Sequence, residues 1–370
     1  MSWPLVRLSE VAEINPRCPK DIDESQTVSF VAMASVSEEG NLLNEEPRTL
    51  GDTKKGFTYF QRSDVLLAKI TPCFENGKSL KPNSISHDVG FGSTEFHVLR
   101  AKEEVLDPSY LFYMVWSKAF RFLGEHAMSG AAGQRRVGAE FLKKHSIPLP
   151  PLAEQKRIAA ILDKADAIRQ KRKQAIDLAD EFLRSVFLDM FGDPTKWNSE
   201  KGRLNWATKT IKEVCPLKRG YDLPTKSRVE GNVPIFAANG MNGSHNEPKV
   251  KGPGVITGRS GTIGKVVYTD KEYWPLNTAL YVTDFCGNNP KYIEWFLRLF
   301  KLERYAQGAG VPTLNRNLFL EEKVYVPSLD EQNKFSGIAE KLEAFACKLS
   351  ETQDGTLFHS VSQKAFSGEL

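Results

Sequence analysis

Basic and hydrogen-bonding side chains gather beside glycines at several points of the chain, a pattern typical of loops that bind nucleic acid. Lysine and arginine can contact phosphates, whereas arginine, amide and hydroxyl side chains can recognise base edges. Glycine lets the backbone approach a phosphate closely. For each such residue, the alternative is an ordinary solvent-exposed side chain. We predict DNA contacts from Lys69, Thr71, Lys78, Gln134, Arg135, Arg136, Asn239, Arg259, Ser260, Thr262, Lys265, Asn315 and Arg316.

The distribution of charge is more informative than its total. The chain has 50 Lys and Arg against 46 Asp and Glu, a net charge of +4, which alone is weak support for binding a polyanion. Residues 207–275 hold eleven basic and six acidic residues, so the excess of positive charge lies in this segment. It is either a solvated surface or a surface that faces phosphates.

Three segments resemble enzyme motifs, but each departs from the required pattern. Asn289-Pro290-Lys291-Tyr292 lacks the second proline of an adenine methyltransferase pocket. Segment 258–266 is one residue too long for a phosphate-binding loop and ends in valine instead of the metal-binding Ser or Thr. Glu154-Gln155-Lys156 could belong to a nuclease, but the related segment 331–333 lacks the lysine. We therefore predict a protein without catalytic residues.

Neither a metal site nor a disulfide framework is expected. The five cysteines are scattered, none forms a C-x-x-C pair, and no histidine cluster lies near one. We predict no metal and no cofactor. The chain has no apolar run of about 18 residues and no signal-like start, so we expect a cytoplasmic protein that does not contact a membrane.

The elements that position these loops occur twice, because the chain is a degenerate repeat. The offset between the copies falls along the chain, so the second globular segment is the shorter one. The matching segments, in the same order in both copies, are 6–11 with 209–214, 107–111 with 289–293, 150–155 with 327–332, and 182–186 with 357–361.

Each copy has the elements of a mixed α/β domain. Asp107-Pro108 and Asn289-Pro290 place a side-chain acceptor at a helix N-cap and a proline at the first helical position. They predict core-packed helices over 109–123 and 291–305. Short strands with long loops are expected before these helices, at 65–68, 96–99, 254–257 and 280–282.

After each globular segment, apolar residues follow steps of three and four, which predicts a helix that packs against another helix. The first helix, from Leu152 to Met190, would be roughly 58 Å long at 1.5 Å per residue. Gly355 is expected to end or kink the second helix near Thr352. The predicted seam consists of Ile158, Ile161, Ala165 and Ile168 in the first copy, and of Phe335, Ile338, Leu342 and Phe345 in the second.

Together these features resemble the specificity subunit of type I restriction-modification enzymes, over essentially the whole chain. The segments that carry the resemblance are 64–78, 150–158, 187–194, 256–265, 326–332 and 364–370. It implies two target-recognition domains that each recognise one half of a split, asymmetric site in double-stranded DNA, with the helices as a ruler. It also implies two methyltransferase subunits as partners, which a motor-nuclease subunit can join; the partners methylate adenine and cleave DNA.

The predicted fold class is α+β, with two mixed α/β target-recognition domains separated by two long antiparallel coiled-coil helices. The competing hypothesis is a coiled-coil scaffold whose globular domains bind proteins and have no DNA specificity. The expected parts are a first recognition domain at 1–149, a central helix at 150–192, a connector at 193–206, a second recognition domain at 207–327 and a C-terminal helix at 328–370.

Overall fold

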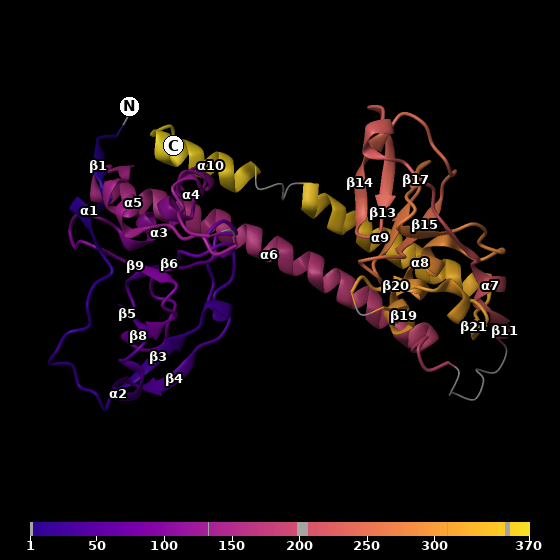
Figure 1. The fold of residues 1–370 in the computed structure, drawn as a ribbon, viewed down its shortest axis with the longest axis horizontal. Helices are drawn as coiled ribbons and strands as arrows, with labels where there is room; N and C mark the ends of the chain where they lie inside the picture. Colours follow the sequence, from indigo (N-terminus) through magenta and orange to yellow (C-terminus); the bar gives the residue numbers. More distant parts are fainter. Residues whose placement is uncertain (1–2, 132, 198–205, 309, 352–355) are drawn as a thin grey trace. The chain divides into compact units, whose positions relative to one another are not determined.

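The computed structural model describes residues 3–131, 133–197, 206–308, 310–351 and 356–370. The chain divides into two compact units (Figure 1). Unit 1 comprises Met1–Arg172 and Thr352–Leu370, and unit 2 comprises Lys173–Glu351. In the described part of the chain, no helix is both long enough and apolar enough to cross a membrane.

Unit 1 contains two four-stranded sheets. The first has the order β2-β9-β6-β7 (Ala12–Ile14, Phe96–Ala101, Val65–Ala68 and Ser79–Leu80) and is antiparallel throughout. The second has the order β4-β3-β8-β5 (Glu46–Thr49, Thr27–Val31, Val89–Gly92 and Thr58–Gln61). Unit 1 also contains β1 (Leu5–Arg7), which pairs with β10 (Ser146–Pro148), and the short helices α1 (Leu8–Val11), α2 (Leu50–Thr53), η1 (Met33–Ser35) and α5 (Ala139–Lys144).

Unit 2 contains one four-stranded and one three-stranded sheet. The first has the order β12-β18-β15-β16 (Leu217–Arg219, Ala279–Val282, Gly254–Gly258 and Val266–Thr269), and the second β14-β13-β17 (Gly240–His245, Val233–Ala237 and Trp274–Pro275). β11 (Ala207–Thr210) pairs with β21 (Lys323–Val326), and β19 (Ala306–Gln307) with β20 (Thr313–Leu314). The short helices are α7 (Ile211–Val214), η2 (Thr225–Ser227), η3 (Leu302–Tyr305) and η4 (Arg316–Leu318).

The matching topology confirms the internal repeat. In each first sheet, the strand after the first short helix (β2 or β12) pairs with the strand that comes last in the chain (β9 or β18). The strand orders are therefore β2-β9-β6-β7 and β12-β18-β15-β16. The four strands predicted from the sequence are β6, β9, β15 and β18. The second sheets differ in strand number and order, so the units share a scaffold and differ in what is built on it.

The predicted helix caps are present in both units. Asp107 accepts a hydrogen bond from the Tyr110 amide at the start of α3 (Pro108–Trp116), and Asn289 accepts from the Lys291 and Tyr292 amides at the start of α8 (Pro290–Leu299). The segment 109–123 forms two helices instead of one. The reason is Ser117, whose side chain caps a new helix, α4 (Lys118–His126).

The predicted long helix is α6 (Leu152–Phe191), an unbroken helix of 40 residues (Figure 1). Its first half packs on the core of unit 1, where Ile158 is fully buried and Ala165 lies against the same apolar cluster. Ile161 is half-buried and Ile168 is 46% exposed. The apolar stripe is therefore buried against unit 1 at its start and exposed toward Ile168.

The described part of the C-terminal segment consists of two helices, α9 (Leu329–Glu351) in unit 2 and α10 (Thr356–Ser367) in unit 1. The helix end expected near Thr352 lies outside the described residues. In α10, Phe358 and Ala365 join the core of unit 1.

Within unit 2, α9 and the second half of α6 share an aromatic contact. The ring of Phe335 lies 5.2 Å from that of Phe187 and 5.8 Å from that of Phe191, measured between centroids. Leu342 packs against the same core, whereas Ile338 and Phe345 are 37% and 51% exposed. The predicted seam in unit 2 is thus buried at Phe335 and partly at Leu342, whereas Ile338 and Phe345 are exposed.

A buried glutamine joins each long helix to its unit. Gln155 accepts a hydrogen bond from the Asp107 amide (2.8 Å) and donates to the carbonyls of Val105 and Pro150. Gln332 makes the equivalent contacts: it accepts from the Asn289 amide (2.9 Å) and donates to the Asn288 side chain and the Pro327 carbonyl. The repeated Glu-Gln motif therefore ties the first turn of each long helix to the capped helix of its domain.

Gln332→Ala is expected to reduce the stability of unit 2 by about 1–3 kcal/mol, because it leaves the half-buried Asn289 amide and the buried Pro327 carbonyl without their partner. Urea unfolding of the full chain would measure the loss. Lys334→Ala, at an exposed position on the same helix, serves as the control and is expected to change stability by less than about 0.5 kcal/mol. Equal effects of the two substitutions would show that the glutamine is not a clamp.

Candidate nucleic-acid interface

In unit 2, two predicted loops lie against each other. The loop after β15 and the strand β20 are joined by hydrogen bonds from the Leu314 amide to the Arg259 carbonyl (2.7 Å) and from the Gly261 amide to the Pro312 carbonyl (3.0 Å). The first of these loops folds so tightly that a side chain at Gly258 would place its Cβ 1.7 Å from the Thr262 carbonyl oxygen. Only glycine fits there, and the turn brings Arg259 to the same surface as Asn315 and Arg316.

A pocket of about 420 Å³ opens at this surface. It contains three arginines: Arg219 at the end of β12, Arg259 after β15, and Arg316 in η4. Arg259 and Arg316 were predicted from the sequence, whereas Arg219 was not. The available signal was the Lys218-Arg219-Gly220 triplet in the basic segment, at the end of a short strand. The other lining residues are Leu280, Gln307, Thr313, Leu314, Asn315 and Asn317.

The guanidinium groups of this pocket have mainly neutral partners. Arg259 donates from Nη1 to the Asn277 carbonyl (3.3 Å), and Arg316 donates from Nη1 to the Leu217 carbonyl (3.1 Å). Arg219 lies 3.5 Å from Asp222, in a pair whose side chains are both more than half exposed. No carboxylate is among the described residues that line the pocket. The pocket therefore keeps most of its positive charge, as an anion site requires.

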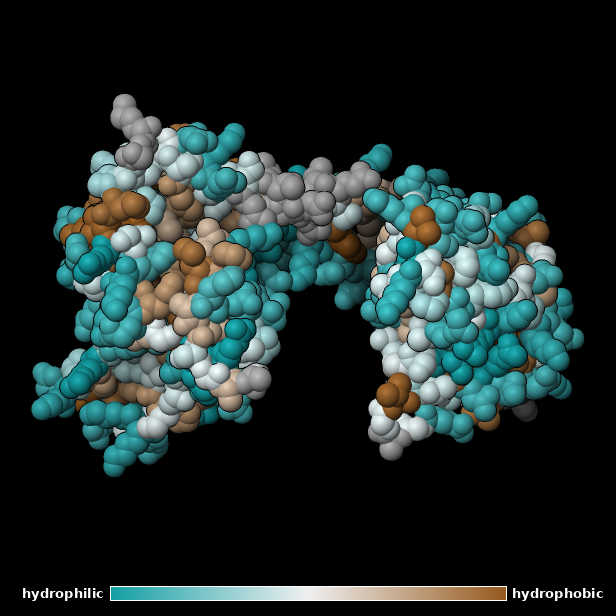
Figure 2. All heavy atoms as spheres, turned by 45° about the horizontal axis from the view of Figure 1, so that its top comes forward, coloured by the Kyte–Doolittle hydropathy of each residue, from teal (hydrophilic) through white to brown (hydrophobic). Residues whose placement is uncertain are grey.

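The remaining predicted residues of unit 2 lie on the loops beside β15. Lys265 donates from Nζ to the Asn239 carbonyl (2.7 Å), which places these two exposed residues together. Ser260 forms an isolated bridge with Thr313, and Thr262 is exposed in the turn. Figure 2 shows that the visible surface of unit 2 is mainly hydrophilic, with only scattered hydrophobic residues. Such a surface suits a wet, polar contact with nucleic acid.

Unit 1 pairs its predicted loops in the same way. The Thr71 amide donates to the Arg135 carbonyl (2.9 Å), and the Val137 amide donates to the Lys69 carbonyl (2.9 Å). These bonds correspond to those between the Arg259 loop and β20, since β6 and β15 are equivalent strands. Lys78 is the exception, because its Nζ donates to the Met33 carbonyl on another loop. Gln134 is exposed beside the paired segments.

The two predicted arginines of unit 1, unlike Arg259 and Arg316 of unit 2, are paired with carboxylates. Arg136 donates to Glu95 from both Nε and Nη2, the shorter distance being 2.9 Å. This guanidinium holds the pKa of the Glu95 carboxyl below its usual value. Arg135 lies 3.7 Å from Glu75 and 4.0 Å from Glu125. The positive charge of these two residues is therefore largely compensated.

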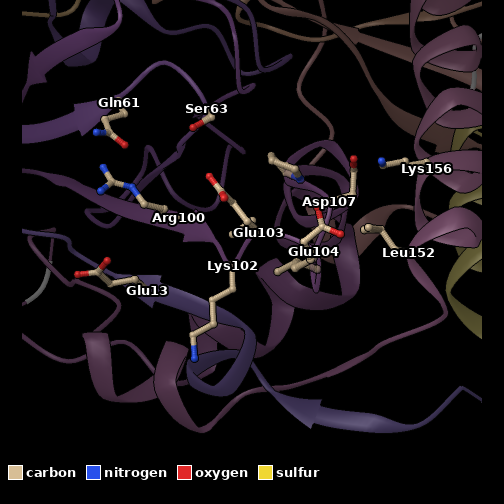
Figure 3. A pocket seen from close by; sticks show the side chains of 13 residues that line it. Glu13, Gln61, Ser63, Arg100, Lys102, Glu103, Glu104, Asp107, Leu152 and Lys156 are labelled. Carbon is tan, nitrogen blue, oxygen red and sulfur yellow. The ribbon is translucent and has the colours of Figure 1, made fainter.

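A different pocket, in unit 1, does not suit a polyanion. Figure 3 shows Glu103, Glu104 and Asp107 in the middle of the group, with Arg100 and Lys156 to either side. Arg100 forms a bidentate pair with the buried carboxylate of Asp64. The carboxylates of Glu13, Glu103, Glu104 and Asp107 outnumber the three cations of the lining, so the space does not favour a phosphate.

The three enzyme-like segments have structural roles. Asn289 caps α8, and Glu154 pairs with Arg157 within the first turns of α6 at 2.7 Å. The loop 259–265 joins the antiparallel strands β15 and β16, whereas a phosphate-binding loop leads from a strand into a helix. In the described residues, no group of three or more His, Cys, Asp and Glu side chains could hold a metal ion.

Comparisons with known proteins agree with this architecture. A family model described as "Type I restriction modification DNA specificity domain" matches residues 2–178 and 203–355. The chain is 34% identical over 210 residues to the type I restriction enzyme EcoEI specificity subunit of Escherichia coli, a match that covers 55% of this chain and 35% of that subunit. It is 36% identical over 210 residues to the EcoAI specificity subunit of the same species, again over 35% of that subunit's length. The chain thus matches about a third of the length of these two relatives. A crystal structure of a type I restriction-modification S subunit from M. genitalium has the same fold, with a TM-score of 0.61, 18% identity, and coverage of 99% of this chain and 96% of that chain.

Proposed function

The chain belongs to the type I restriction-modification DNA specificity family, and on that premise we propose that it recognises a bipartite, asymmetric sequence in double-stranded DNA. Recognition directs partner subunits that methylate adenine and cleave DNA. The chain itself is not a catalyst in this proposal. The interaction scaffold without DNA specificity is the weaker hypothesis, because it gives no reason for paired basic loops at equivalent positions of two domains.

One observation carries the proposal: the same sheet occurs in both units, and the same loop pair at its edge has different side chains. Unit 1 presents Lys69 and Thr71 beside Arg135, whereas unit 2 presents Arg259 beside Asn315. A shared scaffold with different donors and acceptors is what two unlike half-sites require, since each base pair presents its own pattern in the major groove.

The proposed partners are two methyltransferase subunits and, where present, motor-nuclease subunits, all in the cytoplasm with the chromosome. In this proposal, the recognition domains are residues 1–149 and 207–327, and the long helices set the number of unread base pairs between the half-sites. Half-sites about one turn apart, roughly 34 Å, would need such a rigid spacer. The buried contacts of Gln155 and Gln332 support it, because a ruler works only if each domain is firmly attached to its helix.

Expression of the chain with its methyltransferase, in a host without other adenine methylation, is expected to modify one bipartite motif with an unread gap. Long-read sequencing of the host genome would map the methylated adenines. A host that carries the methyltransferase alone is the control and should show no motif. The same motif without the chain would contradict the proposal, as would methyl transfer or DNA cleavage by the purified chain.

A further inference from the structure

The two units differ in how the charge of the arginines predicted to contact DNA is balanced: Arg135 and Arg136 face carboxylates, whereas Arg259 and Arg316 donate to carbonyls. We infer that the pocket formed by Arg219, Arg259 and Arg316 in unit 2 binds a phosphate of the DNA backbone, and that this unit supplies most of the salt-dependent affinity. In unit 1, the two arginines predicted to contact DNA are already paired with carboxylates. The inference rests on the proposed function and deepens it, because it assigns a ligand group to one pocket and an unequal role to the two domains.

The geometry of the pocket favours a phosphate. Its three arginines come from β12, from the loop after β15, and from η4, so the tertiary fold directs three cations to one space. A guanidinium has five N–H donors, and the carbonyl bonds of Arg259 and Arg316 use one nitrogen of each. The other donors remain available to a ligand. Several guanidinium groups without a lining carboxylate suit the oxygens of a phosphodiester, which accepts bidentate hydrogen bonds from arginine.

The neutral side chains on the same pocket suit a base-recognition role next to that phosphate. Asn315, Asn317 and Gln307 line the space with the arginines. Amide side chains can donate and accept at once, which recognition of a base edge needs, but they add no charge. The arginines would therefore position the backbone, and the amides would lie within reach of the adjacent groove.

In unit 1, charge compensation changes the electrostatic balance of DNA binding. Affinity depends on salt because protein cations release the counterions that are condensed on DNA. Arg136 is held by two bonds to Glu95, and Arg135 lies between Glu75 and Glu125. When such an arginine contacts a phosphate, the nearby carboxylate opposes the gain, so the net charge brought to the duplex is small. These arginines are therefore better suited to orienting the domain on DNA than to increasing its affinity for DNA.

The test is the slope of log affinity against log salt for the full chain, measured by fluorescence anisotropy with a labelled DNA duplex over a series of KCl concentrations. Arg259→Gln and Arg316→Gln are each expected to reduce the magnitude of the slope by about one. Arg219→Gln is expected to reduce it by less, because Asp222 lies 3.5 Å from this arginine. Arg135→Gln and Arg136→Gln are expected to reduce it by less than about 0.5. Glu95→Gln is expected to increase it by about one, because the substitution uncovers the charge of Arg136.

Charge-conserving variants separate a lost phosphate contact from a misfolded domain. Arg259→Lys and Arg316→Lys should keep the slope of the parent chain, and thermal melting of every variant checks the fold. Equal slope changes in the two units would overturn the inference, as would an unchanged slope in the triple glutamine variant of unit 2. If the parent chain binds no DNA, alone or with its methyltransferase, the proposed function itself fails. If the parent chain binds DNA but all variants have the slope of the parent, only the inference about the pocket fails and the proposed function stands.

Discussion

Replacing Phe335 by alanine is expected to reduce the stability of unit 2 by about 3–5 kcal/mol, since it removes a fully buried ring from the contact between α6 and α9. The ring lies near those of Phe187, Phe191 and Trp295, so the cavity would open between both long helices and the core. Urea unfolding of the full chain, followed by hydrogen exchange of peptides from each unit, would measure the loss and locate it.

The matched control is Phe345→Ala, on the same helix. Phe345 is 51% exposed, so its removal should cost less than about 1 kcal/mol. A similar loss from both substitutions would mean that the seam extends along α9 instead of being confined to its start. Faster exchange in unit 1 than in unit 2 for Phe335→Ala would contradict the assignment of this contact to unit 2.

The second large effect is expected from Asp166→Ala in unit 1. The Asp166 carboxylate is 1% exposed, and it accepts hydrogen bonds from Lys81 (2.5 Å) and Arg169 (2.7 Å). Alanine leaves two partly buried cations without their anion, for which the cost is about 3–5 kcal/mol. The same unfolding and exchange measurements apply, and here the loss should appear in unit 1.

Two variants test whether the buried charge is the cause. Asp177→Ala, at an exposed position of α6, should leave stability within about 0.5 kcal/mol of the parent. Asp166→Asn keeps the shape and one acceptor oxygen but removes the charge, so it should still cost most of what alanine costs. Full stability of Asp166→Asn would show that the ion pairs contribute nothing and that only the side-chain volume matters.

The position of Asp166 connects its effect on stability with the proposed recognition of DNA. Glu343 is its counterpart in the second copy, and its carboxylate accepts from Lys291 (2.8 Å) and from the Trp295 indole. In each unit, then, a carboxylate of the long helix is bonded to the body of the recognition domain. Together with Gln155 and Gln332, these contacts would keep a domain in a constant orientation on its helix. A bipartite reader needs that constancy, because a domain that pivots on its helix loses the register between half-sites.

Features that depend on neighbouring residues could be predicted from the sequence. The caps by Asp107 and Asn289 were expected because the acceptor, the proline and the amides they serve lie within four positions. The long helix and the four predicted strands were also found, since their apolar periodicity is local. The repeat could be recognised because the same local signals recur in the same order.

Other features required the folded chain. The apolar residues of 109–123 predicted one helix, but Ser117 caps a second helix within that segment. The apolar residues of α9 form a regular stripe in the sequence, but only part of that stripe is buried. Nothing near Arg136 in the sequence indicates that Glu95 neutralises it, because the partners are 41 positions apart. Likewise, Arg219 joins Arg259 and Arg316 only because the fold brings the ends of β12 and β15 and the segment after β20 to one pocket. The sequence determines which residues carry a charge. Only the tertiary structure decides which of these charges remain available to a ligand, because the neutralising partners are distant in the sequence.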